Sequence, residues 1–193
     1  MRYKTFDKPH SHDAEWYMSR ESADHINQSN HRPRLLKALN MLIELVGENK
    51  DYTICDFGCG NGGLIRTIEQ HLKNKIWGYD LCPANVNDSI LKGSKNIFYK
   101  DFIIQNDLDY PDIAICTEVL EHLVDPDTFL KKLLNNNVKY IIASSPDYET
   151  PTHYEPYHLW VFNGNSYREM FESIGFHVLK HERIGFQFIL AKK

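Results

Sequence analysis

The sequence predicts a single-domain α/β protein with a mostly parallel β-sheet covered by helices on both faces. Short apolar runs that suit buried strands alternate with longer segments whose apolar residues recur at helical spacing. The connections between them are short, and alternation of this kind gives a parallel sheet. The length of 193 residues fits one domain, and no Pro-, Gly- or Ser-rich linker divides the chain.

Each expected element follows from its local pattern. Leu35, Leu39 and Leu42 recur at the spacing of one helix face. Asp125 suits a helix N-cap, and Pro126 suits the first helical position. The expected strands are 52–57, 76–79, 96–99, 112–116, 138–143, 176–179 and 187–191, and the expected helices are 34–45, 62–72, 83–91, 126–134 and 166–174.

The expected sheet has seven strands. The last two, 176–179 and 187–191, are close in sequence, so we expect an antiparallel hairpin at one edge. In a sheet of this class, ligands bind at the carboxyl ends of the parallel strands. The candidate functional residues are therefore sought in the segments that follow the strands.

The composition excludes several classes of protein. Lys and Arg number 22 and Asp and Glu 26, a formal net charge of −4, which disfavours non-specific binding of double-stranded nucleic acid. No apolar run approaches the ~18 residues of a membrane span, and the first residues lack the apolar stretch of a signal peptide. We therefore expect a cytoplasmic protein with no membrane partner. The four cysteines form no C-x-x-C pair and are expected to be buried thiols.

A glycine-rich segment, DFGCGNGG, begins at Asp56 between the first expected strand and the next helix. Gly58, Gly60 and Gly62 permit a sharp turn and close approach of a ligand to the main chain. Asp80 follows Gly58 by 22 residues and ends the next strand, where a carboxylate accepts hydrogen bonds from the ribose of a nucleotide-like cofactor. The negative charge of Asp56 beside the loop favours a cationic ligand over a pyrophosphate.

This segment resembles motif I of the class I S-adenosylmethionine-dependent methyltransferases, and the resemblance extends over about residues 50–180. It implies a Rossmann-like methyltransferase domain at 31–193, preceded by an N-terminal arm or lid at 1–30. It also implies S-adenosylmethionine as methyl donor and S-adenosylhomocysteine as product, with no metal needed for the transfer itself. The implied cofactor-binding residues are Asp56, Gly58, Cys59, Gly60, Gly62, Asp80, Leu81, Asp101, Phe102, Thr117 and Glu118.

A second motif, Glu-Val-Leu-Glu-His, follows the fourth expected strand. On a helical turn, Glu118, Glu121 and His122 would stand at i, i+3 and i+4 and share one face. The motif resembles small-molecule O-methyltransferases of the ubiquinone-biosynthesis type, in which Thr117 and Glu118 would border the cofactor. His122 would then orient the loop or assist the substrate.

The same motif is also similar to that of RNA 3′-terminal ribose 2′-O-methyltransferases. There a further histidine completes a divalent metal site, which would here comprise Glu118, Glu121, His122 and His158, with His153 as another candidate. His158 follows His122 by only 36 residues, and the acid and arginine that flank the downstream histidine in that family are missing. A purely structural role, with these polar groups satisfied at a helix start, also stays open.

The segment after the fifth expected strand is rich in aromatic residues. Tyr148, His153, Tyr157 and Trp160 are expected to line an acceptor pocket at the sheet edge. His153 or His158 would take a proton from an acceptor hydroxyl, since imidazole titrates near neutrality. The arm would add apolar cover through Trp16 and Tyr17.

The leading prediction is an S-adenosylmethionine-dependent methyltransferase that methylates oxygen on a small molecule or sugar, with His122, His158 and Glu121 as catalytic residues. The first alternative is a metal-assisted RNA ribose 2′-O-methyltransferase, with RNA as partner. The second alternative is a methyltransferase-like binding module without turnover. The sequence makes no prediction of oligomeric state.

Overall fold

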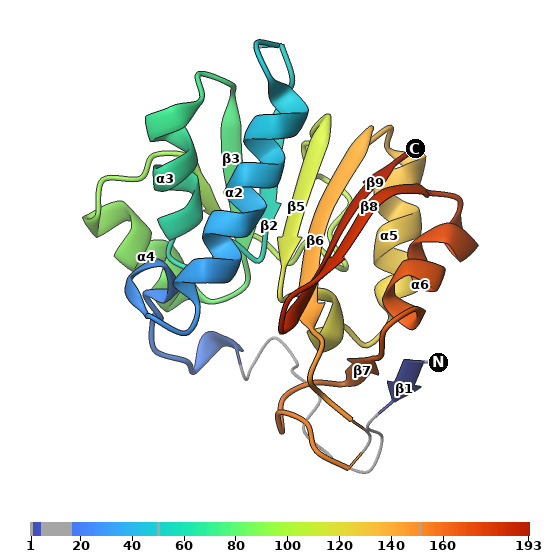
Figure 1. Ribbon diagram of the computed structural model, residues 1–193. Helices are drawn as coiled ribbons and strands as arrows, with labels where there is room; N and C mark the ends of the chain where they lie inside the picture. The colour runs from blue at the N-terminus through green and yellow to red at the C-terminus, as the bar shows by residue number, and fades with distance from the viewer. Residues whose placement is uncertain (1, 5–16, 50, 151) are drawn as a thin grey trace.

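A computed structural model describes residues 2–4, 17–49, 51–150 and 152–193, with residues 2–4 described by their backbone alone. A seven-stranded sheet with strand order β4-β3-β2-β5-β6-β9-β8 forms its centre (Figure 1). Neighbouring strands from β4 to β6 are parallel, and β9 is antiparallel to both β6 and β8. The strands are β2 (Ile54–Phe57), β3 (Ile76–Asp80), β4 (Ile97–Tyr99), β5 (Ile113–Thr117), β6 (Tyr140–Pro146), β8 (His177–Arg183) and β9 (Phe186–Lys192). The predicted α/β class and antiparallel edge hairpin are confirmed.

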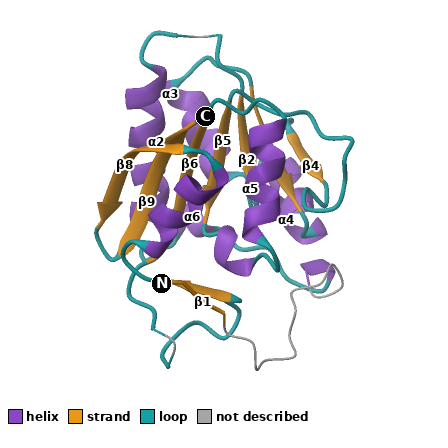
Figure 2. Cartoon of the chain, turned by 90° about the vertical axis from the view of Figure 1, so that its right-hand side faces the viewer, coloured by secondary structure: helices purple, strands orange, loops and turns teal. Residues whose placement is uncertain are grey.

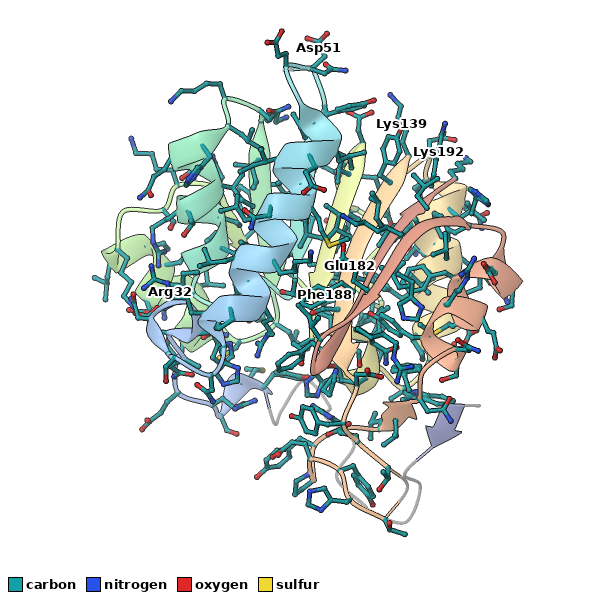
Figure 3. All side chains as sticks on the ribbon, in the orientation of Figure 1. Arg32, Asp51, Lys139, Glu182, Phe188 and Lys192 are labelled. Atoms are coloured by element: carbon teal, nitrogen blue, oxygen red, sulfur yellow. The ribbon has the colours of Figure 1, made fainter. Side chains whose placement is uncertain are left out.

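Helices cover both faces of this sheet. On one face lie α2 (Arg32–Val46), α3 (Gly63–His71) and α4 (Pro83–Leu91), and on the other lie α5 (Pro126–Asn135) and α6 (Ser166–Ile174) (Figure 2). Side chains fill the space between the layers, with Phe188 of β9 among those packed against the α2 side (Figure 3).

Strand β5 shows why the sequence folds this way. Ile113 and Ile115 enter the cluster on the α2 side, whereas Ala114 and Cys116 enter the cluster on the α5 side. Successive side chains of a strand point to opposite faces, so a strand covered on both faces must be apolar throughout. The uninterrupted apolar run of β5 meets this requirement.

A second, two-stranded sheet was not predicted. β1 (Arg2–Lys4) pairs antiparallel with β7 (Trp160–Phe162), so part of the predicted arm and the end of the predicted aromatic loop are strands. The two strands lie far apart in the sequence, and local periodicity carries no information about such a distant pairing. Trp16 lies outside the described residues.

Two other predictions concern the cysteines and membrane-spanning helices. The four cysteines are free and buried, as predicted. Among the described residues, none of the helices has both the length and the apolar character that a membrane crossing requires.

Leucine truncation tests the packing of the sheet. Leu42 on α2 is completely buried against the sheet, whereas 86% of the Leu91 surface on α4 is exposed. We expect Leu42→Ala to lower the free energy of unfolding by about 2–5 kcal/mol, because it removes buried methyl groups and leaves a cavity. The matched Leu91→Ala variant is expected to stay within ~0.5 kcal/mol of the parent in urea denaturation. Equal losses in the two variants would contradict this packing.

Candidate functional site

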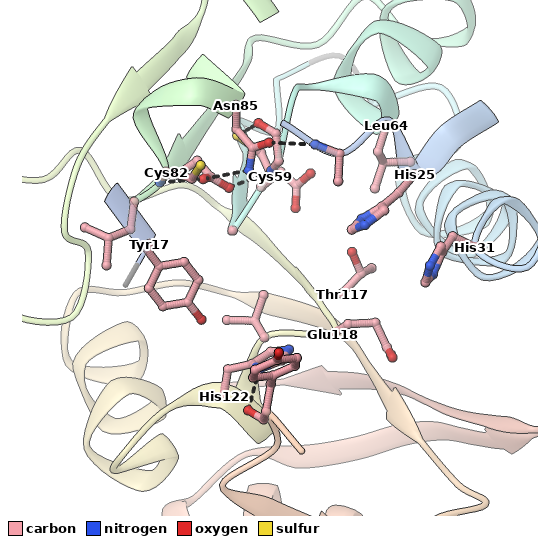
Figure 4. Close-up of a pocket in the computed structure, with 18 of the residues that line it drawn as sticks. Tyr17, His25, His31, Cys59, Leu64, Cys82, Asn85, Thr117, Glu118 and His122 are labelled. Atoms are coloured by element: carbon pink, nitrogen blue, oxygen red, sulfur yellow. Dashed lines mark hydrogen bonds between the residues drawn. The ribbon is translucent and has the colours of Figure 1, made fainter. Parts of the chain in front are cut away.

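A cleft of about 730 Å³ opens at the carboxyl ends of β2, β3 and β5. This volume suits a ligand the size of a nucleoside, since ligand pockets commonly span ~300–1,000 Å³. Residues from the N-terminal segment, the glycine loop, the ends of the three strands and the loop after β6 line the cleft (Figure 4). It lies at the strand ends, as the sequence predicted.

The glycine loop turns back over the end of β3. The amides of Gly58 and Cys59 both donate to the Tyr79 carbonyl, at 2.8 and 3.1 Å. Gly58 has a φ of 73°, and a β-carbon there would lie 2.7 Å from Val119 Cγ2. Gly60 has a φ of 56°, and a β-carbon there would meet no atom within 4 Å. Packing therefore requires glycine at the first position, and the second leaves the main chain open to the cleft.

Asp80 holds this loop from the end of β3. One carboxylate oxygen accepts from the Gly60 amide at 2.7 Å, and the other accepts from the Cys82 amide at 2.8 Å and the Asn85 side chain at 3.2 Å. Burial raises the pKa of Asp80, and these hydrogen bonds oppose the rise. The carboxylate lines the cleft where the loop and α4 begin.

Asp56 also lies beside the loop, but its carboxylate is less well hydrogen-bonded than that of Asp80. Its side chain is buried, and its Oδ1 atom has no hydrogen-bond partner among the described residues. Burial raises the pKa of Asp56 well above its usual range, and the charge of Asp80 raises it further. A buried carboxylate oxygen without a partner fits a cationic group of a ligand, which would restore the missing interaction.

The loop after β4 forms another wall. Asp101 and Phe102 line the cleft, and Asp101 accepts from the Ile103 amide at 3.1 Å. The Phe102 ring is mostly buried, with its centroid 5.4 Å from that of Phe129. Lys132 of α5 fixes this loop by donating to the carbonyls of Phe102 and Ile103, at 3.3 and 3.2 Å.

Glu118 follows β5 in a left-handed backbone conformation, with a φ of 56°. Its carboxylate accepts from the Ser144 hydroxyl at 2.9 Å, and its amide donates to the Ser144 carbonyl at 3.1 Å. The helical turn begins later, as the 3₁₀ helix η2 (Leu120–His122). The prediction that Glu118 shares a helical face with Glu121 and His122 is therefore wrong, because the left-handed turn separates them. Both Thr117 and Glu118 line the cleft.

Three of the four alternative metal ligands come together. Possible ligand atoms of Glu121, His122 and His158 lie within 4.8 Å of one another, and Glu118 is not part of this group. Glu121 is completely buried, and neither carboxylate oxygen has a hydrogen-bond partner among the described residues. Burial raises the pKa of Glu121 well above its usual range, and the charge of Glu118 adds to the rise.

The two histidines face each other across this group. Their rings lie 4.7 Å apart and are nearly perpendicular, at 78°. His122 Nδ1 donates to the Tyr157 carbonyl at 3.1 Å, and Trp160 Nε1 donates to the Leu123 carbonyl at 2.9 Å. These bonds join η2 and the residue after it to β7 and the segment before it. Because a carbonyl only accepts, the His122 proton lies on Nδ1.

The predicted acceptor residues divide into two groups. Tyr148, Tyr157 and His158 line the cleft, whereas His153 and Trp160 lie outside its lining. His153 closes a turn by donating its amide to the Thr150 carbonyl at 3.1 Å. The Trp160 ring stacks on Phe162, with 6.5 Å between centroids. Of the predicted cofactor residues, only Gly62 lies outside the lining. It is the N-cap of α3, and a β-carbon there would meet the Ile97 side chain.

The sequence analysis missed Arg34. Its side chain is buried on α2, lines the cleft, bonds to the His31 ring and lies over the Phe186 ring at 5.7 Å. The sequence feature that could have revealed it is the position of an arginine on the apolar face of this helix, four residues before Ala38. Tyr17 also lines the cleft, and burial raises the pKa of its phenol, with a further rise from Asp80.

The comparison with protein families identifies the chain. A model of the methyltransferase domain family matches residues 29–181. The chain therefore belongs to this family. The glycine loop and Asp80 predicted the class I S-adenosylmethionine-dependent methyltransferases, and the match confirms this prediction.

Two curated relatives and one solved structure show the range of this likeness. The ubiquinone biosynthesis O-methyltransferase of Rickettsia bellii is 28% identical over 106 residues, which are 50% of this chain and 43% of that protein. The small RNA 2′-O-methyltransferase of Arabidopsis thaliana is 28% identical over 125 residues, which are 55% of this chain and 13% of that protein. The matches thus span less than half of either relative. Magnesium protoporphyrin IX methyltransferase from Synechocystis PCC 6803 shares the fold, with a TM-score of 0.66, 16% identity and coverage of 92% of this chain and 88% of that one.

Removing the Asp56 charge tests its burial. Because the pKa of folded Asp56 lies above that of an unfolded aspartate (~3.9), this group destabilises the fold increasingly as pH rises from that value through the folded pKa. Without cofactor, Asp56→Asn should therefore gain stability relative to the parent between pH 4 and pH 8. The gain should reach about 1–3 kcal/mol in urea denaturation. Exposed Asp51, in the loop between α2 and β2, supplies the control Asp51→Asn, for which no such pH trend is expected (Figure 3). A loss of stability in Asp56→Asn at pH 8 would contradict this interpretation.

Proposed function

We propose that the chain is an S-adenosylmethionine-dependent methyltransferase whose donor binds across the glycine loop. The observation that carries this proposal is the carboxylate of Asp80. It bonds to the Gly60 amide at 2.7 Å at the end of the second parallel strand, beside main chain that is open to the cleft. A carboxylate at this point suits the two ribose hydroxyls of the donor.

The other cleft groups match the remaining parts of the donor, which supplies an electrophilic methyl group on a sulfonium. Asp56 Oδ1, buried and without a hydrogen-bond partner in the described part of the chain, suits the ammonium group. The Arg34 guanidinium suits the carboxylate. Asp101 and Phe102, held by Lys132, would border the adenine. The chain then contributes position and exclusion of water more than covalent chemistry.

The acceptor in this proposal is a hydroxyl of a small molecule or sugar. Tyr148 and Tyr157 supply aromatic walls at the open side of the cleft. His122 or His158 would take the hydroxyl proton, because neutral imidazole is a base near physiological pH. The curated relative named for ubiquinone biosynthesis O-methylation supports oxygen as the acceptor atom.

Loss of the Asp80 charge should weaken donor binding. We expect Asp80→Asn to raise the Kd of S-adenosylhomocysteine by about 10–100-fold, since hydrogen bonds to a charged group contribute ~1.5–3 kcal/mol. The matched control is Asp107→Asn, an exposed aspartate that pairs with Lys100. Isothermal titration calorimetry measures both. Unchanged affinity in Asp80→Asn would refute the assignment, and a wild-type protein that binds but transfers no methyl group would favour the binding-module alternative.

A second candidate function is metal-assisted methylation of an RNA 3′-terminal ribose. The observation that favours it is the group of Glu121, His122 and His158. Two imidazoles and a buried carboxylate that has no hydrogen-bond partner among the residues described suit a divalent first-row metal. Such a metal would bind neighbouring ribose hydroxyls. The RNA-methylating relative in Arabidopsis thaliana gives further support.

Metal content separates the two candidates. If the second holds, protein purified without chelator or histidine tag should carry a near-stoichiometric divalent metal by elemental mass spectrometry. Glu121→Gln should then lose most of it, because the amide removes the ligand charge. Glu172→Gln, on the exposed face of α6, is the control and should retain it. Protein without metal that methylates hydroxylated small molecules in the presence of chelator would favour the first candidate.

A further inference from the structure

The loop after β6 contains a buried carboxylate that the donor site does not use. Glu149 is 6% exposed and pairs with His158, whose Nδ1 lies 2.8 and 2.9 Å from the two carboxylate oxygens. The Glu155 amide donates to the same carboxylate at 2.7 Å. A cleft-lining histidine is thus held from behind by an acid on its own loop.

This loop is fixed at both ends. Thr150 and His153 exchange two main-chain hydrogen bonds, of 2.8 and 3.1 Å. The His158 amide donates to the Glu155 carbonyl at 3.0 Å, and the Leu159 amide donates to the Glu121 carbonyl at 2.8 Å. The carboxylate and the imidazole therefore meet in one defined geometry.

Stability alone does not account for this pair. Taking a carboxylate out of water costs several kcal/mol, which its attraction to a partner often only offsets. The larger effect is geometric, because a carboxylate accepts and does not donate. His158 must therefore carry its proton on Nδ1 when the ring is neutral, and its lone pair then lies on Nε2.

We propose that Glu149 is a positioning residue, which fixes the tautomer and orientation of His158 so that Nε2 serves the acceptor side of the cleft. This inference rests on the proposed methyltransferase function. During transfer, the acceptor oxygen bonds to the methyl carbon as the methyl–sulfur bond breaks, with its electron pair going to sulfur. The hydroxyl proton passes to His158 Nε2, and the carboxylate of Glu149 stabilises the positive ring that results.

The tautomer can be observed without any acceptor. In ¹⁵N-labelled protein bound to S-adenosylhomocysteine at pH 8, with chelator, long-range ¹H–¹⁵N spectra distinguish protonated from unprotonated ring nitrogens. His158→Gln assigns the signals. We expect a protonated Nδ1 and an unprotonated Nε2 in the wild type. In Glu149→Gln the amide can donate to Nδ1, so the Nε2–H tautomer should appear. An Nε2–H wild-type ring, or the same tautomer in both proteins, would overturn the proposal.

Kinetics supply a second readout, on whichever hydroxylated acceptor supports methyl transfer. Glu149→Gln should lower kcat by about 10–100-fold and leave the KM for S-adenosylmethionine and the calorimetric Kd of S-adenosylhomocysteine within twofold. Asp147→Asn is the matched control, because it neutralises a carboxylate of the same loop that pairs with Arg183 and should leave kcat unchanged. Parallel losses of kcat and of cofactor affinity would indicate a merely structural role. Failure of the methyltransferase proposal itself would appear separately, as absent donor binding in the wild type.

Discussion

The burial of carboxylates at the carboxyl ends of the parallel strands is the constraint on which this site depends. Asp56, Asp80, Glu121 and Glu149 lie buried there and Glu118 lies half-buried, and burial raises the pKa of Asp56, Asp80, Glu118 and Glu121. Negative groups taken out of water are costly without partners. Each must therefore receive hydrogen bonds, hold a proton or await a cation, and these three conditions distinguish different parts of the site.

Partners from the chain satisfy some of these groups and not others. Asp80 and Glu149 receive several hydrogen bonds, so their main effect is to hold a loop and a histidine ring in place. Among the described residues, Asp56 Oδ1 and both carboxylate oxygens of Glu121 have no hydrogen-bond partner. The Asp56 oxygen lies beside the glycine loop and the Glu121 oxygens lie beside two imidazoles, so the two carboxylates suit different positive groups.

The proposed donor half of the site was largely predictable because its signals are local. The glycines and Asp80 follow strands that apolar runs reveal, and a parallel sheet brings strand ends together. The proposed acceptor half was less predictable. Glu118 has a positive φ, so it does not share the helical face that was expected for it. The hydrogen bond between His158 and Glu149 depends on how the whole loop between them folds. Single-residue backbone geometry and loop closure leave no periodic pattern in a sequence.

The sequence by itself determined the α/β class, the position of the glycine loop and Asp80 after their strands, and the family, because burial on both sheet faces imposes apolar runs and the turn imposes glycines. Only the tertiary structure decided that Arg34 enters the cleft, that His153 and Trp160 lie outside its lining, and that β1 pairs with β7. The physical reason is distance along the chain. These contacts join segments that no local periodicity connects, so packing of the complete chain selects them.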